Sequence, residues 1–115
     1  MRRQRSPNRK AELLQCAPLF AALGDEVRLR LVHRLCDRGP ASITNLTAGS
    51  GVTRQAITKH LRLMENSGLV RCARQGRESV WYLDPTRIED ARRYIDIISR
   101  QWDSALARLR DFVER

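Results

Sequence analysis

The sequence predicts a mainly α-helical domain that carries one β-hairpin and continues into a long C-terminal helix. Apolar residues recur at intervals of three and four along most of the chain, which is typical of helices. The interval changes to two at residues 69–74 and 78–83, which is typical of strands. A chain of 115 residues suits one domain without a deep catalytic cleft, so we expect a binding module and not an enzyme.

Positive charge dominates the composition. The chain holds 22 Lys and Arg against 13 Asp and Glu, a net charge of +9, which favours a polyanionic partner. Residues 1–12 hold five basic and one acidic residue, and residues 53–80 hold six and two, so the excess gathers in these two stretches. No apolar run approaches the roughly 18 residues of a membrane span, and the basic start leads into no signal-peptide core. We therefore expect no membrane partner and a cytoplasmic location.

The N-terminal part divides into a tail and a helix. Residues 1–10 are basic and almost without apolar side chains, so they are expected to form a disordered tail. Residues 11–23 have a helical composition, but Pro18 lacks a backbone N–H and must start a helix or kink one. Gly24 is expected to end this helix.

The next helix is predicted to start after Asp25, a good N-cap residue, and to run for about three turns up to the sequence DRGP. His33 on this helix is interpreted as a partly buried residue. The buried stripe is expected to comprise Val27, Leu31, Val32, Leu35 and Cys36.

A helix-turn-helix is predicted between residues 41 and 68. Ile43 and Leu46 face the same way on a short helix, the sequence GSG turns the chain, and Thr53 caps a longer helix that Gly68 ends. The second helix of this motif lies in the DNA major groove. Its buried positions are expected to be Ala56, Ile57, Leu61 and Met64.

A β-hairpin is predicted to follow. The two strands are separated by the sequence QGR, in which Gly76 can adopt a positive φ. Arg74 and Arg77 are placed beside the tip.

The final segment, residues 85–115, reads as one long helix capped by Asp84 or Thr86. Its apolar stripe is longer than a small domain can cover. The stripe comprises Ile88, Ala91, Ile95, Ile98, Trp102, Leu106, Leu109 and Val113. We expect a dimer interface formed by Ile95, Ile98, Trp102, Leu106 and Leu109. The alternative is that the helix folds back over its own domain.

Three stretches resemble the ArsR family of winged-helix transcriptional repressors: LFAALGDEVRLRLVHRL, TRQAITKHLRLMENSGLV and RQGRESVWYL. The resemblance implies a winged helix-turn-helix at residues 11–84 and a C-terminal dimerisation helix at residues 85–115. It also implies a homodimer, assembled through its N- and C-terminal helices, that sits on an inverted-repeat operator and represses transcription.

Double-stranded DNA is therefore the expected partner. The cap at Thr53 places Arg54 and Gln55 in the first turn of the recognition helix, where side chains reach base edges. The alternative for these positions is a solvated helix face, and for His60 a place packed at the edge of the motif. The candidate DNA-binding residues are Thr53, Arg54, Gln55, Thr58, Lys59, His60, Arg62, Arg74 and Arg77.

No metal or other cofactor is expected. The resembled family commonly binds metal through a C-x-C cluster at the first helix of the motif or through histidines on the C-terminal helix, and this chain has neither. One alternative is a thiol-responsive repressor that uses Cys16, Cys36 or Cys72. Another is a non-specific DNA-coating protein, which would share the charge but need no capped reading helix. The sequence does not identify an effector.

Overall fold

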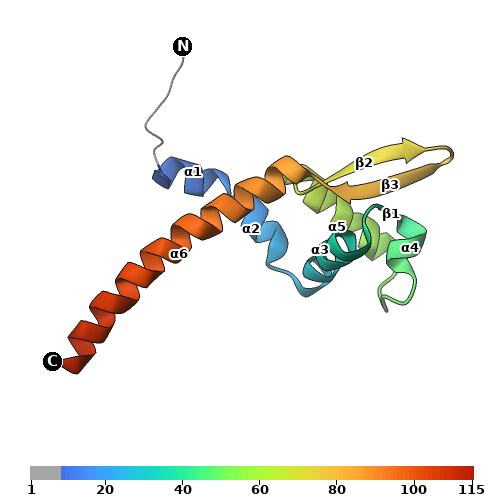
Figure 1. Cartoon of the computed structure of the whole chain (residues 1–115). Coiled ribbons are helices and arrows are strands. Elements are labelled where there is room, and N and C mark those ends of the chain that lie inside the picture. The colour runs from blue at the N-terminus through green and yellow to red at the C-terminus, as the bar shows by residue number, and fades with distance from the viewer. Residues whose placement is uncertain (1–8) are drawn as a thin grey trace, which may run out of the picture.

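The computed structural model describes residues 9–115. The expected tail comprises residues 1–10, of which residues 1–8 lie outside the described range. Figure 1 shows a compact helical body, a hairpin that projects from it, and a long helix that leaves it in another direction. The elements in chain order are α1 (Arg9–Gln15), α2 (Ala17–Leu23), α3 (Glu26–Arg38), β1 (Ala41–Ser42), α4 (Ile43–Thr47), α5 (Arg54–Asn66), β2 (Val70–Gln75), β3 (Glu78–Leu83) and α6 (Pro85–Glu114).

The N-terminal helical segment is interrupted where proline requires it. α1 ends at Gln15, a turn forms at Cys16, and Pro18 lies in the first turn of α2, where its missing N–H leaves no helical hydrogen bond broken. The prediction that Pro18 starts or kinks a helix is confirmed, and Gly24 follows the last residue of α2 as expected.

All three predicted helix caps are present. Asp25 Oδ2 accepts a hydrogen bond of 3.0 Å from the backbone N–H three residues further along, and Thr53 Oγ1 accepts an equivalent bond of 3.1 Å. Asp84 Oδ1 caps α6 by accepting the N–H two residues further along at 2.9 Å. Each side chain satisfies a backbone donor that has no partner within its helix. The starts of α3, α5 and α6 are thus fixed by local sequence.

The hairpin is confirmed, and a third strand joins it. β2 and β3 pair antiparallel around a turn in which Gly76 has a φ of +63°, a conformation that glycine adopts without strain. β1 pairs antiparallel with the other edge of β3, with Ala41 opposite Trp81, so the sheet order is β1-β3-β2. The sequence did not predict β1, because two residues carry no detectable periodicity.

The core lies where α3, α4 and α5 pack together with the base of the sheet. Its most buried large side chains include Leu19, Ile57, Leu61, Met64, Leu69 and Trp81. Two expectations for α3 are wrong, since Cys36 and His33 are both exposed. Cys36 is rotated by about 100° from buried Leu35, and that face of the helix meets solvent. Ala56 is only half-buried.

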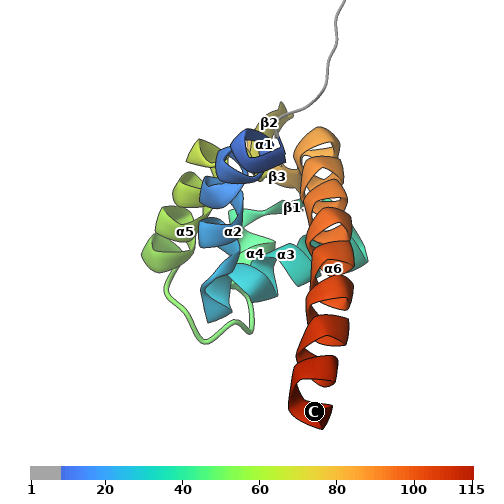
Figure 2. The ribbon, with the colours of Figure 1, turned by 90° about the vertical axis from the view of Figure 1, so that its left-hand side faces the viewer.

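α6 packs on the domain only through its first turns. Ala91 and Tyr94 are buried, whereas every residue from 99 to 115 is exposed. In Figure 2 the C-terminal part of α6 extends past all the other elements without contacting them. The helix does not fold back over its own domain, and its distal apolar residues have no partner within the described chain.

Candidate nucleic-acid interface

The turn between α4 and α5 is held by the side chain of Ser50. Its hydroxyl donates to the Thr47 carbonyl at 2.7 Å and accepts the Val52 N–H at 3.1 Å. Gly49 and Gly51 flank it with φ values of +71° and +72°. The turn therefore has one defined shape, which sets the direction in which α5 leaves it.

α5 presents one polar face to solvent. Gln55, Lys59 and Arg62 are spaced by four and three residues, so they share a face opposite buried Ile57 and Leu61. Together with Thr58, the three side chains line a shallow groove on the helix surface. Four of the nine predicted site residues are thus brought together on an accessible surface.

Arg54 is held against the neighbouring helix. Its Nη1 donates to Thr44 Oγ1 of α4 at 3.1 Å, and its backbone carbonyl accepts the Thr58 hydroxyl at 2.9 Å. The guanidinium thus bridges the two helices of the motif. Local sequence could not reveal this contact, since Arg54 and Thr44 are ten residues apart.

His60 points toward the start of α3. Its Nδ1 lies 3.2 Å from Arg28 Nη1 and 3.8 Å from Asp25 Oδ2. Arg28 also donates to the Ala22 carbonyl at 2.7 Å. Because a guanidinium can only donate, Nδ1 is the acceptor in the shorter contact. This placement supports the alternative that His60 packs at the edge of the motif.

The hairpin adds two exposed arginines at its tip. Arg74 lies near the end of β2 and Arg77 is part of the turn. The structure records no ion pair for either among the side chains that it describes. Arg71, at the other end of β2, instead pairs with Asp84 at 3.1 Å. Cations that remain unpaired at the tip suit an approach to phosphates.

The three cysteines occupy different environments and none is in a disulfide. Cys16 is buried, Cys72 is half-buried and Cys36 is exposed. Burial raises the pKa of the Cys16 thiol, and a hydrogen bond with Tyr94 opposes that shift. Among the side chains that the structure describes, no cluster of three or more His, Cys, Asp or Glu is suited to a metal ion. Within residues 9–115, no helix has the length and apolar content to cross a bilayer.

Comparison with known proteins identifies the family. A helix-turn-helix domain family matches residues 23–73. The chain is 33% identical over 87 residues to the HTH-type transcriptional regulator Rv2034 of Mycobacterium tuberculosis, which covers 76% of this chain and 78% of that protein. It is 30% identical over 80 residues to the arsenical resistance operon repressor of Bacillus subtilis, covering 69% and 76%.

Solved structures share most of this arrangement. An ArsR-like transcriptional regulator from Rhodococcus matches with a TM-score of 0.74 and 31% identity over 91% of this chain and 95% of that one. A homodimeric winged helix-turn-helix domain from Mycobacterium bovis matches with a TM-score of 0.62 and 24% identity, covering 88% and 91%. The capped helix α5, the hairpin with its basic tip and these relatives together show that the chain belongs to the ArsR family of winged helix-turn-helix transcriptional regulators.

Proposed function

We propose that the chain is a homodimeric repressor that binds an inverted-repeat operator in double-stranded DNA. The observation that carries this proposal is the solvent-facing surface of α5 beside the arginine-tipped hairpin. A DNA-binding role follows from the family. The repressor role is drawn from the relative in Bacillus subtilis, which is named for repression of an operon.

Within this proposal, α5 enters the major groove and Gln55 reads bases from its first turn. A glutamine side chain can form two hydrogen bonds with adenine. Lys59 and Arg62, further along the same face, hold phosphates and fix the register. Thr53 serves mainly as the cap that sets the start of α5. Thr58 lines the shallow groove on the surface of α5, together with Gln55, Lys59 and Arg62.

Two further arginine groups complete the proposed DNA surface. Arg74 and Arg77 at the hairpin tip contact the backbone or the minor groove beside the site read by α5. Arg54 reaches DNA only after it leaves Thr44, or else acts from its bridging position by orienting α5. His60 acts through Arg28 and Asp25 and not on DNA.

The proposed dimer forms through α6. Ile95, Trp102, Leu106 and Leu109 are 53–66% exposed and Ile98 is half-buried, and their spacing places all five on one side of the helix. An apolar stripe of this length in water favours association with a second copy. Leu14 on α1 is 62% exposed and would extend the interface to the N-terminal helices. The Mycobacterium bovis domain, which has the same fold, is itself a homodimer.

We favour a regulator without catalytic activity that acts in the cytoplasm, where its DNA target lies. Thiol control is less well supported, because the buried Cys16 has a raised pKa and so forms little of the thiolate that oxidation requires.

The experiment that tests this function compares binding to an operator duplex with binding to a scrambled duplex of the same length and composition. The operator is obtained by selection from random sequence with the purified chain. A specific repressor binds its operator at least about 1000-fold more tightly at physiological salt. Equal affinity at one salt concentration would favour the DNA-coating alternative.

A further inference from the structure

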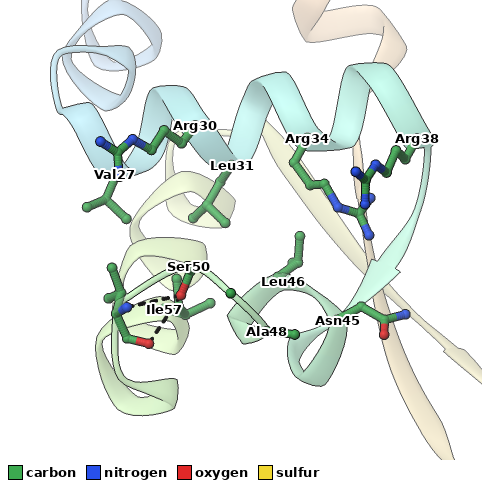
Figure 3. A pocket seen from close by; sticks show the side chains of 12 residues that line it. Val27, Arg30, Leu31, Arg34, Arg38, Asn45, Leu46, Ala48, Ser50 and Ile57 are labelled. Carbon is green, nitrogen blue, oxygen red and sulfur yellow. Dashed lines mark hydrogen bonds between the residues drawn. The ribbon is translucent and has the colours of Figure 1, made fainter.

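A cavity of about 480 Å³ lies between α3 and the turn of the helix-turn-helix. Figure 3 shows α3 above it and α4 with the turn below. Its floor is apolar and is formed by Leu31 of α3, Leu46 of α4 and Ile57 of α5. A cavity of this size matches the range of about 300–1000 Å³ that small-molecule sites occupy.

Two arginines stand at one end of this cavity. Arg34 and Arg38 lie four residues apart on one face of α3. In Figure 3 their guanidinium groups come together beside Leu46, above Asn45. Neither has an ion-pair partner among the side chains that the structure describes, whereas Arg30 on the same face pairs with Glu26 at 2.6 Å. Like charges four residues apart on a helix repel each other. An anion bound between the two guanidinium groups would offset that repulsion by attracting both.

We propose that this cavity binds a small organic anion, a carboxylate or phosphate attached to an apolar body. The guanidinium pair would bind the anionic group through charge-assisted hydrogen bonds, and the apolar body would rest on the leucine and isoleucine floor. The side-chain amide of Asn45, which also lines the cavity, offers a further donor.

The cavity is separate from the proposed DNA surface. None of the residues that line it belongs to the groove on α5 or to the hairpin tip. Its lining does include Gly49, Ser50 and Val52 of the turn that directs α5. An occupant would therefore contact the turn without competing for the DNA face, which is the position of a ligand that modulates DNA binding.

The test uses the ¹⁵N-labelled full chain and two probes of equal size, 2-naphthoate and its uncharged analogue 2-naphthamide. We expect 2-naphthoate to shift the amide resonances of residues 27–52 and to bind at least about tenfold more tightly than 2-naphthamide, a difference of about 1.4 kcal/mol. Equal binding of the two probes, no binding of either, or shifts confined to α6 would overturn the proposal.

A matched pair of variants localises the anionic contact. Arg34→Gln with Arg38→Gln removes two charges at the cavity, and Arg100→Gln with Arg108→Gln removes two from exposed positions on α6. The first pair should weaken 2-naphthoate binding about tenfold or more and leave the weak 2-naphthamide binding unchanged, and the second should change neither. An equal loss in both pairs would mean that the probe responds to net charge and not to this site.

Discussion

Arg62 of the recognition helix lies over the indole ring of Trp81 in the hairpin, with its Cζ 5.3 Å from the ring centroid. The same guanidinium reaches Glu65 Oε1 at 3.1 Å. A cation over an aromatic face is attracted by the ring quadrupole. One side chain thus connects the helix proposed to enter the major groove with the strand that supports the wing.

Replacing Arg62 with Ala should therefore affect both folding and DNA binding. Because the side chain is 62% exposed, the loss of unfolding free energy should be only about 0.5–1 kcal/mol. If Arg62 also holds a phosphate, the slope of log affinity against log salt should fall by about one. Urea denaturation and DNA titrations at several salt concentrations measure the two effects.

The matched control is Lys59→Ala. Lys59 shares the groove with Arg62, but the structure records no hydrogen bond or ion pair for its side chain within the described range. The Lys59→Ala variant should lower the slope of log affinity against log salt without changing the free energy of unfolding. If both variants unfold like the wild type, the contact with Trp81 contributes nothing measurable.

Gln55→Ala should relax base preference at one position of each half-site. The expected loss of discrimination is about 1–3 kcal/mol, since a bidentate contact with adenine would be removed. Binding selection with the variant measures this. Lys59→Ala, by contrast, should weaken binding to all sequences alike. An unchanged consensus for the Gln55 variant would refute its reading role.

Charges placed in the apolar stripe of α6 should separate the dimer. Trp102→Glu combined with Leu106→Glu buries two carboxylates in the proposed interface, and sedimentation should then report a monomer. The control is Ser104→Glu with Ala107→Glu, which adds the same charge on the opposite face of the helix. A dimer that survives the first pair places the interface elsewhere.

The capping residue of α3, Asp25, should make the stability of the fold depend on pH. The backbone N–H of Arg28 donates to Asp25 and holds the pKa of that carboxyl below its ordinary value of 3.8. A carboxyl whose pKa is lower in the folded state contributes stability above its unfolded pKa, and this contribution is lost as the pH falls through the folded pKa.

Asp25→Asn should keep the capping hydrogen bond, since asparagine is an equally good N-cap, but lose this acid sensitivity. Urea denaturation at neutral pH should show the variant slightly less stable than the wild type, because its amide lacks the contribution of the ionised carboxylate. Below about pH 4 the variant should lose stability less steeply. Identical slopes for the two proteins would mean that Asp25 does not contribute to acid unfolding.

The three thiols should differ in reactivity. Cys36 is exposed and should react first with iodoacetamide, Cys72 more slowly, and the buried Cys16, with its raised pKa, only after the chain unfolds. Peptide mass spectrometry with and without urea follows each site. A disulfide to Cys16 formed by peroxide in the native protein would revive the thiol-responsive alternative.

Much of the fold could be predicted because its signals are local. Asp25, Thr53 and Asp84 each cap a helix by accepting a backbone N–H no more than three residues away. Gly76 permits the hairpin turn through the positive φ of its own backbone. These are short-range effects of capping and φ preference, so a single sequence contains them.

The remaining features depend on packing between distant segments. β1 exists because Ala41 and Ser42 meet the free edge of β3. Tyr94, which was not part of the predicted apolar stripe, is buried on the inner face of α6. Periodicity alone does not fix the rotation of a helix against its neighbours. Among the site residues, the contacts of Arg54 with Thr44 and of His60 with Arg28 likewise join different helices.

The measurement that tests the central proposal most directly is selection of bound duplexes from random DNA, followed by sedimentation of the selected complex. Two copies joined through α6 should recover an inverted repeat whose half-sites are centred about one helical turn, roughly 34 Å, apart. The complex should contain two chains per duplex. Recovery of a single unpaired half-site, or of no consensus at all, bound by one chain would contradict the account.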